Sequence, residues 1–553
     1  MRHGSPRPHT SSAITGDAEA FSDSSTDFQS LQTPQSVQFV TNSKVFDPSD
    51  VGEQLQWAHE GEIYTLRRQQ QQVPHSRPPR DQILSTATLL ALSYFVVGNG
   101  PEGGEAVIVT AGPLVGLVTL IIFPLVYFIP MGFLLTELVS AIPEAGGHAY
   151  WVALAFGPAW GLQAGFWAWV GNCMHCAAYV SIGVSVIYRV LGWEDMPVLE
   201  YTMRAGISML LALASFFQLR VVGYAAGAII VFILVPFAVG YLMLVVSYVV
   251  ANVCGAYAQL IAVWSAVRAE HWENLSVIPD ATMKAEDKRL GYGSLVTVLA
   301  WNFNGYQNLS VFAKCVRDPP RTFRRVMLIS LVLIPLSYLV PIIPVIALGE
   351  PDWTSWTGSS SAIYYAGKHL GGSICKVWIT VLSLLCDAGL YIGSLLCSVF
   401  LACGMAEKDF APFSLRFSGM AWPSVHGIDH SVIFCSLAII LIVVTTTIED
   451  MILISNALSG LETMALITAA VKLRVTMPDL PRSTYLCGSS HVLLMTASLI
   501  VPFAVSGFVV IWAFTELIPA VLTGVFLFSG IIYGLQSDLK DFHHTYESVR
   551  TSN

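Results

Sequence analysis

Two acidic side chains stand inside long apolar segments of the sequence. Glu105 follows the glycine-rich run Gly98–Gly104, and Asp387 lies within Leu385–Gly389. Because burying an unpaired carboxylate is expensive, an acid in such a segment is a candidate for binding an amine or carrying a proton. The structural alternatives are a carboxylate bonded to helix-end amides for Glu105 and a buried interhelical hydrogen bond for Asp387.

Two polar side chains share one helical turn of another apolar segment. His175 follows Asn172 closely in the sequence. Histidine changes charge near neutral pH, which suits proton coupling, and the alternative is a neutral histidine that bonds a neighbouring helix. Asn172 could bond a substrate carboxylate or a neighbouring helix. Glu102, within the glycine-rich run, could face an aqueous vestibule.

A polar and aromatic cluster, Trp301–Asn308, interrupts a further apolar segment. Trp301 and Tyr306 could close over a cationic or aliphatic ligand through cation–π or apolar contact, and ordinary packing is the alternative. We expect the two interrupted segments and the acids near them to line one ligand site. Its candidate residues are Gly98, Asn99, Gly100, Glu105, Asn172, Trp301, Asn302, Asn304, Tyr306, Gln307 and Asp387. The candidates for proton coupling are Glu105, His175 and Asp387.

The composition places these residues in a lipid environment. Of the 553 residues, 54% are hydrophobic and 12% are charged, whereas ordinary soluble domains have roughly 25% charged residues. Apolar blocks of about twenty residues or more, enough to cross a hydrocarbon core about 30 Å thick, recur along the chain. Because Asn-Gly and Asp-Gly hairpin signals do not separate them, helices and not a β-barrel must satisfy the backbone. The twelve predicted spans are Gln82–Ala111, Pro113–Ile142, Trp160–Val190, Tyr201–Leu219, Val222–Val250, Gly291–Val316, Val326–Leu348, Gly372–Met405, Ser431–Ile448, Met451–Val471, His491–Trp512 and Phe514–Leu535.

The first and sixth of these spans cannot stay helical along their whole length. Gly98–Glu105 contains four glycines and a proline, and in a helix interior Gly costs about 1 kcal/mol and Pro about 3 kcal/mol. The polar cluster Trp301–Asn308 is the second interruption. Broken first and sixth helices are typical of inverted repeats of five helices around a midplane site. Close packing at the glycines and interhelical bonds from the asparagines are the alternative.

The predicted organisation is a disordered cytosolic tail (residues 1–80), a transmembrane domain (81–536) and a cytosolic C-terminal tail (537–553). The apolar stretch 251–267 could be a membrane-surface helix or an extension of the fifth span. Lys and Arg gather in the loops on one side of the predicted helices. Because cytosolic loops carry an excess of these residues, we expect both termini to lie in the cytosol. These residues are Arg67, Arg68, Arg77, Arg80, Lys314, Arg317, Arg321, Arg324, Arg325, Lys472, Arg474 and Arg482. We expect the protein to lie in the plasma membrane, and an organelle membrane is the alternative.

The sequence contains no paired nucleophile and base, Walker loop, dinucleotide fingerprint or metal-binding quartet, so it does not indicate an enzyme or an ATP-driven pump. The ten cysteines lie mostly in apolar segments, as small buried hydrophobes do. We therefore expect no cofactor, no metal and no nucleic-acid partner. The expected partners are the lipid bilayer, a small amine or amino acid, and protons, with sodium left open as the coupling ion.

Short motifs of the chain resemble the amino acid–polyamine–organocation superfamily. The segments similar to its signature loop are Pro143–Trp151, Phe156–Pro158 and Gly161–Gly165. More narrowly, the chain resembles the polyamine and amino acid permeases of plants and trypanosomatid protists at Gly100-Pro101, Glu105, Trp301–Asn304 and Gly404–Glu407. The resemblance covers residues 81–536.

The resemblance implies an all-α polytopic membrane protein with twelve transmembrane helices. Ten of them would form a 5+5 inverted repeat with broken first and sixth helices, and two would be peripheral. It also implies a secondary active transporter of amino acids or polyamines, driven by proton symport through alternating access. Polyamine carriers of this kind hold carboxylates where this chain has His175 and Gln307, so both substrate classes stay open. A nutrient receptor with the same fold, which uses its tail to signal and moves no solute, is the alternative.

Two further acids, Glu137 and Glu144, flank the signature loop on the predicted cytosolic side. Basic residues follow the sixth span on the same side. Pairs between these acids and Arg317, Arg321 or Arg324 could latch an inward gate.

Overall fold

A computed structural model describes residues 84–193, 196–216, 221–232, 272–279, 291–349, 352–356, 361–407, 430–488, 490–527 and 532 of the chain. Contacts divide the chain into Met1–Arg77 and Pro78–Asn553, and every described residue belongs to the second unit. The predicted tails, residues 1–80 and 537–553, and the apolar stretch 251–267 lie outside the described residues.

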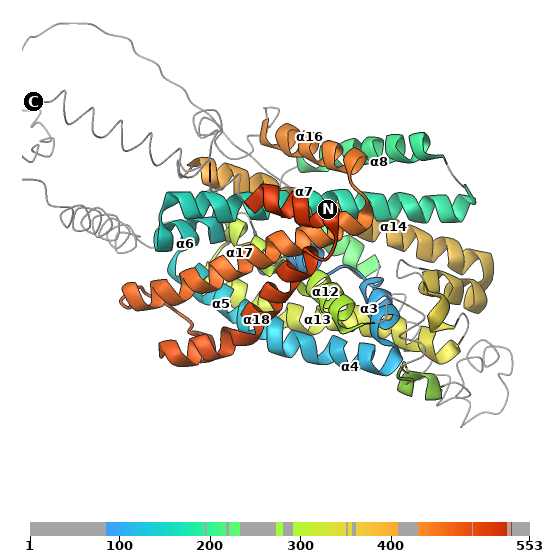
Figure 1. Ribbon diagram of the computed structural model, residues 1–553, viewed down its shortest axis with the longest axis horizontal. Coiled ribbons are helices and arrows are strands. Elements are labelled where there is room, and N and C mark those ends of the chain that lie inside the picture. The colour runs from blue at the N-terminus through green and yellow to red at the C-terminus, as the bar shows by residue number, and fades with distance from the viewer. Residues whose placement is uncertain are drawn as a thin grey trace, which may run out of the picture. The chain divides into compact units, whose positions relative to one another are not determined.

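The described part is built from helices (Figure 1). In these residues β-type pairing is confined to one isolated bridge between Leu84 and Val316. The α-helices are α2 (Thr86–Val97), α3 (Gly103–Ala111), α4 (Pro113–Phe123), α5 (Ile129–Ala141), α6 (Gly147–Phe156), α7 (Pro158–Leu191), α8 (Pro197–Ala212), α12 (Tyr292–Phe303), α13 (Pro319–Leu348), α14 (Ser361–Glu407), α16 (His430–Thr445), α17 (Ile448–Thr476) and α18 (Val492–Ala513), with two further helices at Val221–Phe232 and Leu517–Leu527. Shorter elements are the π-helical turn η1 (Pro124–Phe128) and the 3-10 segments η2 (Leu213–Phe216), η3 (Trp272–Ser276), η4 (Tyr306–Cys315), η5 (Trp353–Ser355) and η6 (Leu486–Gly488). The chain is therefore all-α in this part, as predicted.

Long apolar helices account for much of this architecture. Over the described ranges, six helices are long and apolar enough to cross a bilayer. They are Pro113–Ala141, Pro158–Leu191, Pro319–Leu348, Lys376–Glu407, Ile448–Thr476 and Val492–Ala513. Each of the twelve predicted spans contains at least part of a helix, although α14 begins at Ser361 and not at Gly372.

The start of the signature motif differs from the prediction. Pro143–Trp151, predicted as a loop, runs into helix α6. Gly146 precedes this helix with a φ of 82°, a left-handed conformation that glycine adopts without steric cost. Because α6 packs against α7, α17 and η4, it belongs to the packed interior.

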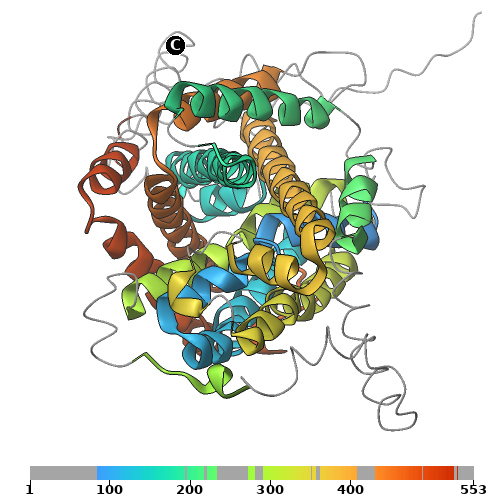
Figure 2. The same ribbon diagram turned by 90° about the vertical axis from the view of Figure 1, so that its right-hand side faces the viewer.

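The core lies around α7. Of its most apolar window, 83% is buried, against 28% for α18, so α7 is central and α18 peripheral. Buried side chains of α7, α14, α16 and α17 form one apolar cluster that includes Cys176, Tyr391, Ile439 and Leu458. Figure 2 shows α7 nearly end-on with other helices around it. Its polar side chains therefore face neighbouring helices and not lipid.

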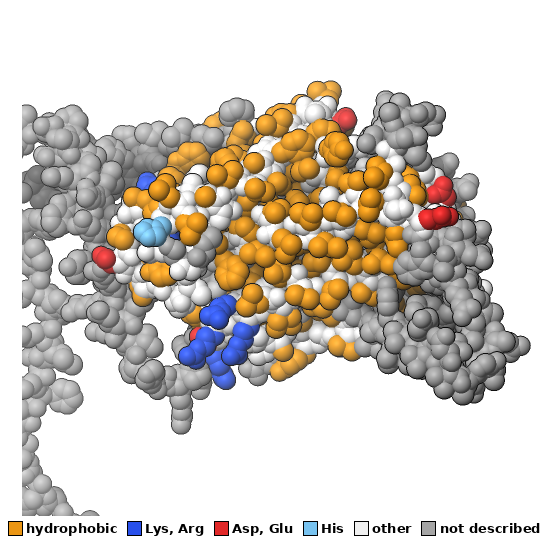
Figure 3. Space-filling view, turned by 90° about the horizontal axis from the view of Figure 1, so that it is seen from below, with side chains coloured by type: hydrophobic (Ala, Val, Ile, Leu, Met, Phe, Trp, Pro, Cys, Tyr) orange, Lys and Arg blue, Asp and Glu red, His pale blue; other side chains and the backbone are white. Residues whose placement is uncertain are grey.

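The outer surface carries a broad apolar region. Figure 3 shows hydrophobic side chains across the middle of one face, with Lys and Arg gathered towards one end. Large exposed apolar residues of α18 include Leu493, Ile500 and Ile511. An apolar belt beside a basic end is the surface that a bilayer-spanning bundle presents.

The beginning of α6 meets the end of α14 at two glycines. A Cβ atom on Gly404 would lie 2.1 Å from the backbone nitrogen of Gly146. Nearby, Lys314 of η4 forms an ion pair with Glu407 at the last turn of α14. Because both partners at the glycine contact are backbone, neither can move aside for a side chain.

We expect Gly404→Ala to destabilise the protein by about 1–3 kcal/mol, the usual cost of overpacking. The matched control is Gly206→Ala in α8, since nothing lies within 4 Å of a Cβ atom there. That substitution should stabilise the helix by up to about 1 kcal/mol. Thermal unfolding of both purified variants measures the difference, and equal midpoints would show that the two helices do not meet at Gly404.

Candidate functional site

The first predicted break is present. Helix α2 ends at Val97 and α3 begins at Gly103, so Gly98–Glu102 separates them. Gly100 has a φ of +69°, and a Cβ atom there would lie 2.2 Å from the Sγ atom of Cys386 in α14. Glycine is therefore required both by the backbone conformation and by the approach of α14.

The second predicted break is present as well. Helix α12 ends at Phe303, and η4 begins at Tyr306. The Oδ1 atom of Asn304 accepts hydrogen bonds from Gly305 N at 2.9 Å and from Gln307 Nε2 at 3.2 Å. Asn304 thus supplies an acceptor where the helical backbone pattern is interrupted.

A glycine allows the second break to pack closely against the first broken helix. Gly305 has a φ of +91°, and its Cβ position lies 2.3 Å from the carbonyl oxygen of Val96 near the end of α2. A side chain at Gly305 would push the two breaks apart. The interruptions therefore form one structural unit.

Asparagine side chains join the two breaks directly. Asn99 Nδ2 donates to Trp301 O at 2.9 Å and to Asn302 Oδ1 at 3.0 Å. In return, Asn302 Nδ2 donates to Gly103 O at 2.7 Å. Each broken helix therefore provides side-chain partners for the other one.

Two tyrosines from neighbouring helices complete this network. The hydroxyl of Tyr338 in α13 accepts from Asn99 N at 2.8 Å and donates to Asn302 O at 2.7 Å. Tyr179 of α7 donates to Asn99 Oδ1 at 2.7 Å. Asn99 and Asn302, both predicted site residues, are thus held from two sides.

An aromatic cluster lies beside the network. The ring centroids of His175 and Trp301 are 4.6 Å apart, those of Tyr179 and Trp301 5.8 Å, and those of His175 and Tyr179 6.1 Å. Trp301 is only partly buried, whereas His175 is 7% exposed. The structure brings these two predicted residues together, and Tyr179 of α7 packs beside both of them.

Asp387 is a buried acidic residue beside the first break. It is 8% exposed, and its Oδ2 atom has no hydrogen-bond partner among the described residues. The Oδ2 atom lies 3.3 Å from the Cβ position of Gly183 in α7. Tyr179 and Glu102 are within electrostatic range of this carboxylate. Asp387 therefore combines burial, an acidic group and an open acceptor near the aromatic cluster.

Glu105 lies in a different environment. It is fully buried, and its Oε2 atom accepts a hydrogen bond from Ala362 N at 3.0 Å at the beginning of α14. This contact matches the structural alternative of a carboxylate at helix-end amides, where the helix dipole favours negative charge. The substrate and proton roles of Glu105 stay predictions.

Other predicted residues are engaged away from this cluster. Asn172 and Asn308 exchange hydrogen bonds of 3.2 Å and 2.8 Å, so each side-chain amide satisfies the other. Tyr306 is fully buried and packs against Tyr127 and Phe128 of η1. Trp301 and Tyr306 therefore contact different neighbours and do not build one shared aromatic wall in this structure.

The predicted latch has other partners. Glu137 forms buried ion pairs with Arg474 and with Arg482, the latter at 3.3 Å, and not with the arginines that follow the sixth span. Burial lowers the pKa of Arg482, and the charge of Glu137 opposes that shift. Arg321 pairs with Asp318 on the surface. The latch hypothesis for Glu137 is therefore wrong, because distant chain segments supply its cations.

Several residues of the site were not expected from the sequence. Tyr179 and Tyr338 bond the breaks, Asn308 pairs with Asn172, and a buried contact joins His148 to Glu462. A lone tyrosine in an apolar helix is most often packing, so the sequence offers no signal for the first two. Asn308 lies inside the predicted polar cluster and could have been identified there.

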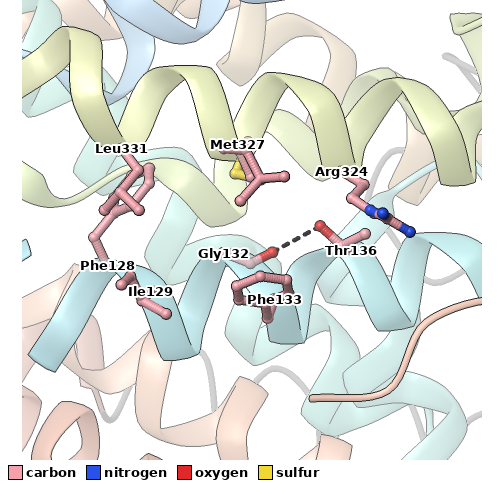
Figure 4. Close-up of a pocket in the computed structure, with 9 residues that line it drawn as sticks. Phe128, Ile129, Gly132, Phe133, Thr136, Arg324, Met327 and Leu331 are labelled. Atoms are coloured by element: carbon pink, nitrogen blue, oxygen red, sulfur yellow. Dashed lines mark hydrogen bonds between the residues drawn. The ribbon is translucent and has the colours of Figure 1, made fainter. Parts of the chain in front are cut away.

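A surface pocket lies elsewhere, between α5 and α13 (Figure 4). Its lining is apolar apart from Thr136 and Arg324. The Thr136 hydroxyl is already used, because it donates to Gly132 O at 2.8 Å. The lining contains no acidic side chain that could pair with an ammonium group. No group of three or more His, Cys, Asp or Glu residues that could hold a metal occurs in the part of the chain that the structure describes.

Family membership follows from sequence comparison. A family model described as amino acid permease matches residues 83–535, which is most of the chain and includes both breaks. The chain belongs to the amino acid permease family. This permease is therefore an integral, multi-pass membrane transporter and not an enzyme.

Curated plant proteins are its relatives. The permease is 27% identical over 416 residues to a probable polyamine transporter of Arabidopsis thaliana, covering 74% of this chain and 78% of that one. It is 24% identical over 407 residues to polyamine transporter PUT1 of Oryza sativa subsp. japonica, covering 73% and 70%. Polyamine transporter RMV1 of Arabidopsis thaliana is 25% identical over 334 residues, with 60% and 61% covered.

The tyrosine network makes a testable prediction. Tyr338→Phe removes the partner of Asn99 N and leaves a buried N–H group unsatisfied, so we expect a loss of about 1–3 kcal/mol of stability. The measurement is the thermal unfolding midpoint of the purified permease. Tyr224→Phe is the matched control, because Tyr224 is 63% exposed and should be insensitive to the change. A Tyr338→Phe midpoint equal to that of the control would contradict the network.

Proposed function

We propose that this permease is a secondary active transporter that carries a small organic amine, a polyamine or an amine-bearing amino acid, in symport with protons. The observation that supports a cationic substrate most strongly is the buried Asp387 carboxylate, whose Oδ2 atom has no hydrogen-bond partner among the described residues. An uncompensated buried charge is costly. A substrate ammonium or a proton would remove that cost.

The surroundings of Asp387 suit the rest of such a substrate. Trp301, Tyr179 and His175 present ring faces close to one another. An ammonium near the face of a tryptophan or tyrosine gains about 0.5–2 kcal/mol, more when it is desolvated. The methylene chain of an amine would also lose unfavourable contact with water against these rings.

The asparagines of the two breaks would contribute less directly to substrate binding. Their amide groups are occupied with each other and with the freed backbone. We therefore assign Asn99, Asn302 and Asn304 to shaping the site, and Asp387 with the aromatic rings to binding the substrate. Gly98 and Gly100 would also shape the site, because Tyr94 and Cys386 occupy the places where their Cβ atoms would lie.

The names of the relatives favour a polyamine. Three plant proteins that match most of the transport domain are named polyamine transporters or probable ones. The family model is named for amino acids. A molecule with an ammonium group is common to both, and it is the group that Asp387 would recognise.

Alternating access would follow from the fold that we propose for the membrane domain: twelve transmembrane helices with a 5+5 inverted repeat. The helices around the breaks would rock against a scaffold that contains α7, α14 and α17. The helices that would rock include α2 and α13. Ser93 of α2 and Ser330 of α13 share a hydrogen bond of 2.8 Å, which supports their moving as one rigid group. Tyr338 ties the same helix α13 to both breaks.

The basic end of the surface (Figure 3) supports an orientation with both termini in the cytosol. We propose the plasma membrane as the site of action. The alternative, a nutrient receptor with this fold, would bind the same amine without moving it. Deletion of residues 1–77 would abolish signalling by a receptor, whereas a transporter should retain uptake.

Uptake by transporter-deficient cells tests the proposal. Radiolabelled putrescine, spermidine, arginine and a neutral amino acid are supplied at two external pH values, with and without sodium. We expect acid-stimulated, sodium-independent uptake of one amine class. Asp387→Asn should weaken substrate affinity about 10- to 100-fold, since a charge-assisted hydrogen bond is worth about 1.5–3 kcal/mol.

Asp352→Asn is the matched control, because Asp352 is an exposed loop residue and should leave uptake unchanged. Equal affinity in Asp387→Asn and wild type would contradict a cation site at Asp387. Binding of the amine without uptake, by protein shown to be at the cell surface, would favour the receptor.

A further inference from the structure

A histidine and a glutamate meet in the interior, away from Asp387. The Nε2 atom of His148 in α6 lies 3.2 Å from Oε1 of Glu462 in α17. His148 is fully buried and Glu462 is 1% exposed. This contact is not aligned as a hydrogen bond, and His148 Nε2 and both carboxylate oxygens of Glu462 have no hydrogen-bond partner among the described residues. The side chain of Gln307 also lies near Glu462.

The other face of the imidazole contacts the broken sixth helix. His148 Nδ1 lies 3.3 Å from the carbonyl oxygen of Gln307 and 3.1 Å from the hydroxyl of Ser310, both in η4. The Ser310 hydroxyl already accepts a hydrogen bond from His148 N at 2.9 Å. One imidazole thus connects α6, η4 and α17, close to the second break.

The partners of the ring determine how many hydrogens it needs. A backbone carbonyl can only accept, so Nδ1 must carry a hydrogen to bond Gln307. The contact between Nε2 and the Glu462 carboxyl then requires a second hydrogen, either on Nε2 or on the carboxyl group. A neutral imidazole beside an ionised carboxylate can donate from Nε2 to Glu462 and accept from the Ser310 hydroxyl at Nδ1, but it then loses the contact with Gln307.

The charges near the pair also favour one bound proton. Over the described residues, the titratable groups near Glu462 besides His148 are Tyr127 of η1, Tyr306 of η4 and Cys397 of α14, and none of them is cationic. Further along α17, Arg474 is paired with Glu137 of α5. With one shared proton the His148–Glu462 pair is neutral, and without it the interior holds a net negative charge.

We propose that His148 and Glu462 together bind one proton, and that this proton holds α6, η4 and α17 in the arrangement seen here. When the proton leaves, the imidazole can bond either Gln307 or Glu462 but not both. Loss of the Gln307 contact frees the backbone of η4 at the break. This site deepens the proposed function, on which its role in symport rests, by placing a proton site outside the amine site.

Stability against pH tests proton binding without any substrate. The folded protein holds a proton at this pair that the unfolded chain releases, so stability falls as the pH rises through the range where the folded pair loses it. We expect the wild-type unfolding midpoint to fall from mildly acid to mildly alkaline pH and Glu462→Gln to lose that part of the slope. Glu449→Gln, an exposed acid on the same helix, is the matched control and should follow wild type.

A slope in Glu462→Gln equal to that of the control would overturn the proposal. If Glu462→Gln does not fold, the pH dependence of the wild type alone decides. A wild-type midpoint that does not fall with rising pH would overturn the proposal without any variant.

Transport in liposomes then tests the coupling. We expect Glu462→Gln to retain exchange of labelled putrescine for unlabelled putrescine and to lose accumulation driven by a pH gradient. Accumulation equal to wild type would overturn the coupling role. If the wild type itself transports no amine, the proposed function fails, and the stability measurements still decide whether the pair binds a proton.

Discussion

Backbone groups freed inside an apolar bundle must find partners, and this constraint shapes the centre of the permease. Each unsatisfied N–H or C=O group in a lipid-like interior costs several kcal/mol. Two helices are interrupted here, and Asn99, Asn302 and Tyr338 supply the missing partners across the gap between them. The two breaks depend on each other, because several partners of each come from the other one or from α13.

The same constraint limits what the site can offer a ligand. The asparagine amides that were predicted to bind a substrate hold the breaks together, and Asn172 is bonded to Asn308. What remains near the first break is the acidic group of Asp387, whose Oδ2 atom has no hydrogen-bond partner among the described residues, and the ring surface of Trp301, Tyr179 and His175. Under the proposed function, recognition by one acidic group and several ring faces would discriminate poorly between amines of similar shape. Both polyamines and amine-bearing amino acids would then fit the proposal.

The breaks could be predicted from the sequence because their cause is local. Glycine and proline destabilise a helix wherever they occur, and asparagines in an apolar span are conspicuous. The partners of Glu137 and Glu105 could not be predicted, because they are set by packing between distant segments. Arg474 and Arg482 come from the far end of α17 and the loop after it, and the contact of Glu105 depends on α14 beginning at Ser361. Tyr179 and Tyr338 could not be predicted for another reason. A tyrosine that donates a hydrogen bond has the same sequence signal as one that only packs, and only the structure distinguishes them.

Helix α17 connects these separate observations. Its buried Glu462 contacts His148 of α6, which in turn contacts η4, and its buried Arg474 contacts Glu137 at the end of α5. Helix α5, which precedes the signature motif, and α6, which contains part of it, are thus bound to one scaffold helix by buried polar contacts. Such contacts differ from apolar packing in how they respond to displacement. Apolar surfaces can slide by small steps, whereas a buried ion pair or hydrogen bond that is broken leaves an uncompensated group and a large penalty. A bundle held in this way has a few discrete arrangements and not a continuum, which is the property that a carrier exposing its site to one side at a time requires.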